Sequence, residues 1–179
     1  MNMIMNGPVP PERQAASKYN YKIFALINGL SYMCLGETVI ILLAVQLNCK
    51  DYIVSALGAM LYFGFLLLPL GKIVTAHVGA AQSQGIFWVL RNISALIVAA
   101  ATPVCIYVSQ TLAVIILLAG AFLFYGFRAA GTVMVQPLLG EMTNRSDRSA
   151  FIALTTALFY ATCFIALVAI SIVLHYTRS

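Results

Sequence analysis

Charge is what this sequence has least of. Only 8% of its 179 residues are Asp, Glu, Lys or Arg, and just 5 of them are acidic. Soluble domains typically carry about 25% charged residues, because charge keeps their surface in water. With 62% hydrophobic residues and a mean hydropathy of +0.96, the composition excludes a soluble globular domain, a disordered tail and a coiled coil. The remaining class is a polytopic membrane protein.

Catalytic and metal-binding motifs are also missing. The 4 cysteines are scattered without a CxxC spacing, and neither histidine has a metal-ligand partner nearby. The sequence has no phosphate-binding glycine loop, nucleophile elbow or carboxylate cluster. We therefore expect no enzymatic activity, no metal and no cofactor. The net charge of +5 includes no dense basic patch, so we do not expect nucleic-acid binding.

Long apolar runs are abundant. Five of them are long enough to cross about 30 Å of hydrocarbon, at residues 23–47, 53–70, 86–108, 112–139 and 150–174. Since lipid cannot satisfy an open sheet edge, these runs should be helices. We expect an all-α membrane protein with a five-helix transmembrane domain at 21–179, after a flexible cytoplasmic tail at 1–20. Short turns follow the first and third helices, and polar loops are expected at 71–85 and 140–149.

The basic residues predict the orientation. Six lie on one expected side and two on the other: Arg13, Lys18, Lys22, Lys72, Arg145 and Arg148 against Lys50 and Arg178. Basic residues favour the cytoplasmic side, so the N-terminus should be cytoplasmic and the C-terminus outside, in a plasma or inner membrane. Cys49 and Cys105 then both fall near the outer face, which leaves a disulfide between them open.

Three charged residues, Glu37, Arg91 and Arg128, fall inside predicted spans. Each costs at least about 2.5 kcal/mol at mid-bilayer, so such residues are expected to face protein or a water-filled path. Glu37 and Arg128 lie at matching depths from the inner side, roughly 21 and 17 Å. We therefore predict that both face one central cavity. The alternatives are an ion pair that fixes helix register and an acid that couples transport to protons.

Arg91 lies nearer the inner boundary, at a depth of roughly 8 Å. From there its side chain can extend to the inner surface. We interpret it as a structural or gate residue rather than a substrate ligand.

Small residues predict where helices pack. Ala153, Ala157 and Ala161 recur every four residues, a spacing that lets another helix approach closely. Two further pairs offer similar surfaces, Gly58 with Ala59 and Gly126 with Ala130. General helix packing is the simpler interpretation of all three sets. Pro103 and Pro137 are expected to kink their helices.

The stretch LLLPLGKIVTAHVGAAQSQGIFWVLRNISAL resembles the second cytoplasmic loop of the major facilitator superfamily. Gly71 or Lys72 lies at the start of that loop motif, and Gly79 matches its later glycine. The stretch FYGFRAAGTVMVQPLLGE resembles the family's helix-four motif, in which Arg128 matches the arginine. The chain departs from the loop motif, because Ala76 and His77 replace the family's aspartate and arginine, and Ala80 and Ala81 replace its following basic pair.

The resemblance implies the architecture and function of that family. Each half has six helices in two inverted triplets, helices one and four line a central cavity, and helices two and five contact the other half. It implies a cytoplasmic gate at Gly71, Lys72, Gly79 and Arg91. The expected function is secondary transport of a small solute, with protons as a candidate coupling ion. The chain would be an N-terminal portion, lacking helix six and the C-terminal half. The alternative is a non-transporting subunit that binds a partner through helices two and five.

Overall fold

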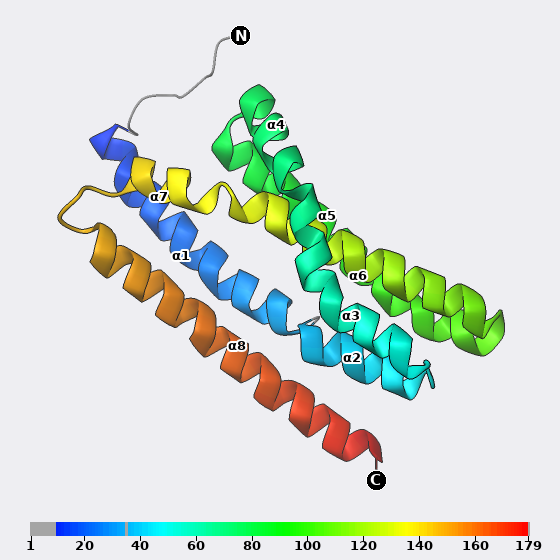
Figure 1. Ribbon diagram of the computed structural model, residues 1–179. Helices are drawn as coiled ribbons and strands as arrows, with labels where there is room; N and C mark the ends of the chain where they lie inside the picture. The colour runs from blue at the N-terminus through cyan, green and yellow to red at the C-terminus, as the bar shows by residue number, and fades with distance from the viewer. Residues whose placement is uncertain (1–9, 35, 179) are drawn as a thin grey trace. The chain divides into compact units, whose positions relative to one another are not determined.

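The computed structural model describes residues 10–34 and 36–178, and within them the chain is helical without strands. The elements are α1 (Pro11–Cys34), α2 (Glu37–Gln46), α3 (Asp51–Gly64), the 3₁₀ turn η1 (Phe65–Leu67), α4 (Leu68–Val78), α5 (Ala80–Tyr107), α6 (Gln110–Thr132), α7 (Val135–Met142) and α8 (Arg148–Arg178). Figure 1 traces them in this order along the chain.

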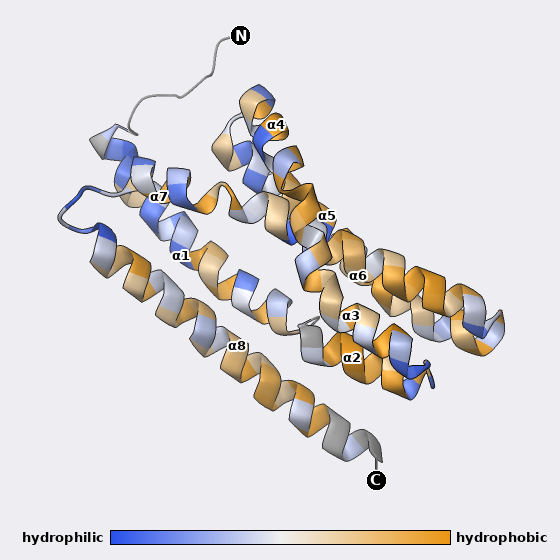
Figure 2. Cartoon of the chain, viewed as in Figure 1, coloured by the Kyte–Doolittle hydropathy of each residue, from blue (hydrophilic) through white to orange (hydrophobic). Residues whose placement is uncertain are grey.

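In the part of the chain that the structure describes, five helical stretches are long and apolar enough to cross a membrane: Glu12–Gln46, Asp51–Val78, Ala80–Tyr107, Gln110–Met142 and Arg148–Val173. They confirm the expected all-helical chain with five apolar spans, and they are compatible with an integral membrane protein. Hydrophobic residues run along α3, α5, α6 and α8, whereas hydrophilic residues gather at the start of α1 and in the α7–α8 loop (Figure 2).

The helices begin earlier than hydropathy predicts. Residues 11–20 were expected to belong to a flexible tail, but α1 begins at Pro11. Proline at the first helical position and Glu12 in the first turn both favour a helix start. The following glutamine, two alanines and lysine are good helix formers, so this stretch is helical although it is polar.

The loop expected at 71–85 is reduced to one residue. α4 continues to Val78, α5 begins at Ala80, and Gly79 alone makes the turn with φ 86°. That left-handed conformation strains any residue with a side chain, so glycine is required here. The loop expected at 140–149 is also shorter than expected, because α7 continues to Met142 and α8 begins at Arg148.

Three of the five spans are interrupted. The first leaves helical form at Gly36, the second tightens into η1 at Phe65–Leu67, and the fourth breaks at residues 133–134. Proline explains two of these positions. Pro69 lies in the first turn of α4, and Pro137, which has no N–H to donate to the carbonyl of Val133, follows the third break. Pro103 lies inside α5, which nevertheless continues to Tyr107.

The described chain divides into two compact units. Unit 1 comprises residues 37–136, and unit 2 comprises residues 10–36 and 137–178. In unit 1, α5 and α6 lie side by side (Figure 1). The stretch α3–η1–α4 packs on α6 through glycines: a Cβ at Gly64 would lie 2.7 Å from the Tyr125 carbonyl carbon, and one at Gly71 would collide with the Ala130 carbonyl. Gly126 and Ala130, two of the predicted packing residues, are both buried in this interface.

Unit 2 is built mainly on α1 and α8, which also lie side by side (Figure 1). Gly29 of α1 approaches α8 so closely that a Cβ there would collide with Thr162 and the Phe159 carbonyl. Aromatic pairs flank this contact on both sides, Tyr21 with Phe151 and Tyr32 with Phe159. The α8 residues used in packing are therefore on a different face from the predicted alanine ladder.

Candidate functional site

Glu37 and Arg128 both belong to unit 1, but the predicted cavity between them stays a prediction. Glu37 is the first residue of α2, and its side chain lies outside the described residues. Arg128 lies in the last two turns of α6 and is half-buried. The Arg128 carbonyl accepts a hydrogen bond from Thr132 Oγ1 at 2.7 Å, close to the point where α6 ends.

The four predicted gate residues lie around the α4–α5 hairpin of unit 1. Gly71 is buried against the backbone of α6, and Gly79 makes the turn. Lys72 is exposed, whereas Arg91 is only 1% exposed. Gly71 therefore has a packing role and Gly79 a turn role. The two basic residues differ in their surroundings, because Lys72 is exposed and Arg91 is buried.

Arg91 does not extend to the surface, which corrects the expectation made from its depth. Its guanidinium carbon lies 5.2 Å from the Trp88 ring centroid and 5.7 Å from the Phe124 ring centroid. Trp88 lies one helical turn before Arg91, and Phe124 comes from α6. Gly131 makes room for the indole ring, since a Cβ there would collide with it. A cation between two rings gains about 2 kcal/mol when water is excluded, which offsets part of its burial cost.

The buried side chains of α5 change from mostly polar to apolar along the helix. Up to Ser94 its buried side chains are polar apart from Phe87, and beyond Ser94 they are Val98 and Ala101: the buried polar residues are Ser83, Gln84, Arg91 and Ser94. The amide Nε2 of Gln84 is buried without a hydrogen-bond partner among the described residues. Polar groups on the protein-facing side of an apolar helix are costly, and they mark candidate functional sites. Of this set, only Arg91 was predicted from the sequence as a candidate site residue.

A second polar contact joins α4, α5 and the break after α6. The Thr75 hydroxyl oxygen lies 2.7 Å from the Gly71 carbonyl oxygen, 2.9 Å from Ser83 Oγ and 2.8 Å from Met134 Sδ. One hydroxyl donates a single hydrogen, so Ser83, which is fully buried, can supply the hydrogen between the two hydroxyls. This contact fixes the hairpin against the α6–α7 break, and sequence spacing gave no signal of it.

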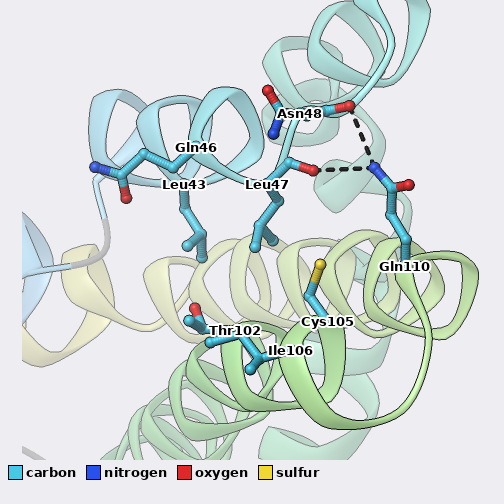
Figure 3. A pocket seen from close by; sticks show the side chains of 8 residues that line it. All are labelled: Leu43, Gln46, Leu47, Asn48, Thr102, Cys105, Ile106 and Gln110. Atoms are coloured by element: carbon cyan, nitrogen blue, oxygen red, sulfur yellow. Dashed lines mark hydrogen bonds between the residues drawn. The ribbon is translucent and has the colours of Figure 1, made fainter.

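Unit 1 holds a cavity of about 470 Å³ beside the turns that join α2 to α3 and α5 to α6 (Figure 3). Its lining is uncharged: Leu43, Gln46, Leu47, Asn48, Thr102, Cys105, Ile106 and Gln110. Gln110 Nε2 donates to the carbonyls of Leu47 and Asn48, at 3.1 and 3.3 Å. Amide and hydroxyl groups of this kind can bind a neutral polar group, and no charge of the lining selects for an ion.

The alanine ladder lies on an exposed face of α8. Ala153, Ala157 and Ala161 are all exposed, whereas Phe151 and Thr162 face α1. The ladder therefore takes no part in the α1–α8 contact. Whether it binds another helix stays a prediction.

No protein-family model, curated protein or solved structure matches this chain. The resemblance to the major facilitator superfamily therefore stays an expectation from two sequence motifs.

Unit 2 carries an ion pair between Lys18 of α1 and Asp147, just before α8. The Lys18 ammonium, hydrogen-bonded to the carboxylate, holds the pKa of Asp147 below its ordinary value. The Asp147 carboxylate also accepts a hydrogen bond from the Asn144 backbone N–H at 2.7 Å. Together these contacts tie the start of α1 to the loop before α8.

This pair predicts a pH-dependent stability. A lowered folded-state pKa means that the contribution is present above the ordinary Asp pKa of about 3.9 and is lost as pH falls through the folded value. We expect Asp147→Asn to lower the thermal midpoint slightly at pH 7, and the difference from wild type to vanish near pH 2. Thermal unfolding in detergent, followed by labelling of buried Cys163, measures it. A difference that stays constant from pH 7 to pH 2 would contradict the assignment.

Proposed function

We propose that this chain forms part of a secondary transporter that moves a small solute by alternating access. The observation that carries the proposal is that the first and fourth spans are both interrupted, at Gly36 and at residues 133–134. Interrupted helices are a recurring feature of transporter substrate sites, because the ends of half-helices present unpaired backbone groups and partial charges. In the family that the sequence resembles, helices one and four are equivalent members of the two inverted triplets.

The intramembrane charges lie beside these interruptions. Glu37 begins α2 directly after the first break, and Arg128 lies one turn before α6 ends at Thr132. The chain also crosses between its two compact units at residues 36/37 and 136/137, close to the same two breaks. Breaks at such crossings favour a role as hinges. In this proposal Glu37 binds the coupling proton and Arg128 compensates its charge or binds an anionic solute.

We assign the orientation and the gate as the resemblance implies. The N-terminus is cytoplasmic, following the distribution of basic residues. The α4–α5 hairpin with Gly71, Lys72 and Gly79 forms the inner gate. Arg91 holds that gate together through Trp88 and Phe124 and does not contact solute.

Proton coupling is tested by replacing Glu37 with glutamine. In proteoliposomes holding a pH-sensitive dye, a panel of sugars, organic acids, amino acids and drugs is added outside. We expect at least one solute to drive proton movement in wild type and Glu37→Gln to reduce it roughly tenfold or more, because the neutral amide cannot carry the proton. Glu12→Gln, which alters an exposed carboxyl at the start of the same span, should leave the movement unchanged. Equal proton movement in both variants removes Glu37 from the mechanism.

One observation favours the second candidate, a non-transporting subunit that binds a partner in the membrane. The ladder Ala153, Ala157 and Ala161 is exposed although its spacing suits close helix packing. Ala157→Cys, in a background whose other cysteines are serine, should then cross-link to a co-purified partner. Leu167→Cys, an exposed position outside the ladder, serves as the control. Equal cross-linking at both positions would count against a specific surface.

A further inference from the structure

Two partly exposed thiols lie in unit 1. Cys49 is in the turn between α2 and α3, and Cys105 is in the last turn of α5. Both are free and of intermediate burial, unlike the buried Cys163. Their surroundings place them within one small region of the molecule.

The two thiols share their neighbours. Cys105 lines the 470 Å³ cavity together with Asn48 and Gln110, and Cys49 lines an adjoining cavity of about 360 Å³ together with the same two residues. Figure 3 shows the sulfur of Cys105 directed toward the backbone of Leu47 and Asn48. Cys49 is the next residue along that backbone. The geometry therefore places the Cys105 sulfur beside the turn that carries Cys49.

The turn itself is held in place. Gln110 Nε2 donates to the carbonyls of Leu47 and Asn48, and the Cys49 N–H donates to the Ala44 carbonyl at 3.0 Å. Asn48 adopts φ 52°, a conformation that asparagine tolerates better than most residues and that reverses the chain before Cys49. Cys49 is thus fixed beside the end of α5 rather than carried on a free loop.

Electrostatics agrees with this proximity. Burial raises the pKa of the Cys49 thiol, and the neighbouring Cys105 raises it further. Charge on one sulfur disfavours charge on the other only at short range. Cross-linking should therefore become faster as pH rises and Cys49 ionises.

We propose that Cys49 and Cys105 are a redox-active pair, which an external disulfide oxidises to an intramolecular disulfide. One thiolate attacks the donor disulfide, forming a mixed disulfide and releasing one donor thiolate. The second thiolate then attacks the cysteine sulfur of that mixed disulfide and releases the other donor thiolate. Two protein thiols are oxidised, one donor disulfide is reduced to two thiols, and the two protons pass to the released thiolates. The bond joins the α2–α3 turn to α5 beside the cavity.

The test uses the full chain in detergent, with Cys34→Ser and Cys163→Ser so that only the pair remains. With oxidised glutathione as the donor, we expect maleimide-reactive thiols to fall from two to none, with a mass loss of two hydrogen atoms. A thiol reductant should reverse both changes. Peptide mapping of oxidised wild type should recover the Cys49–Cys105 cross-link, which guards against misfolding of the background variant. Cys49→Ser and Cys105→Ser should instead retain one glutathione each.

Two results would overturn the proposal: two glutathione adducts on the paired background, or dimers linked between chains. A second arm compares intact with permeabilised cells, because oxidised glutathione does not cross membranes. Cross-linking in intact cells supports both the pair and the outer position of the turn. Cross-linking only after permeabilisation supports the pair but contradicts the proposed orientation. The pair does not depend on transport, so failure of the transport assay leaves this result standing.

Discussion

Replacing Gly71 with alanine should lower the stability of unit 1 by roughly 1 to 3 kcal/mol, the usual cost of overpacking a well-packed interface. The added methyl would collide with the Ala130 carbonyl, a backbone group of α6 that cannot rotate away as a side chain can. Relief requires α4 to move away from α6, and the Thr75 contact to Met134 would then lengthen. Trp88, the single tryptophan, packs against α6 and reports unfolding of this unit by its fluorescence.

Gly64→Ala tests the same interface one helical segment earlier. Its Cβ would lie 2.7 Å from the Tyr125 carbonyl carbon and 2.9 Å from the Gly126 nitrogen, so a similar loss is expected. Gly58→Ala is the matched control, because it lies in α3 with no heavy atom within 4 Å of the added carbon. Alanine favours a helix over glycine by about 1 kcal/mol, so Gly58→Ala should be neutral or stabilising. Equal losses for Gly58→Ala and Gly71→Ala would show that helix contact is not the cause.

The five spans were predictable because each is a run of consecutive, mostly apolar residues in the sequence. Two of the helix boundaries were not, because residues 11–20 are polar yet helical, and α4 continues past Lys72 to Val78. Pro137 predicted a distortion of the fourth span, and the chain breaks just before it. Gly36 gave no comparable signal, since a single glycine inside an apolar run is compatible with a continuous helix.

The site was less predictable because depth does not say which way a side chain faces. Arg91 was expected to extend to the surface, but it is 1% exposed and lies against the rings of Trp88 and Phe124. The spacing of Trp88 and Arg91, one helical turn apart, could have indicated their stacking. Phe124 could not have been found, because it comes from a different helix. The sequence also does not say which small residues face another helix. Gly126 and Gly58 were both predicted to pack, but Gly126 lies in an interface, whereas Gly58 faces open space.

Replacing Arg91 with alanine should cost roughly 2 to 4 kcal/mol, because it empties a buried site and removes the stacking on two rings. The side chain is 1% exposed, so neither lipid nor water fills the gap without rearrangement. Trp88 would lose the guanidinium beside its ring, and its emission maximum should shift along with the thermal midpoint. Lys72→Ala, which removes an exposed basic residue at the same end of the molecule, should change stability by less than about 0.5 kcal/mol.

Two further variants separate packing from charge at this position. Arg91→Lys keeps the charge but loses the planar group that stacks on aromatic rings, so it should recover only part of the stability. Arg91→Met fills the space without charge, and uncharged replacements of buried ionic groups are often well tolerated. If Arg91 serves to hold α5 and α6 together, methionine should restore more stability than lysine. The reverse order would mean that the charge itself is required, and Arg91 would then join Glu37 and Arg128 as a candidate for the solute pathway.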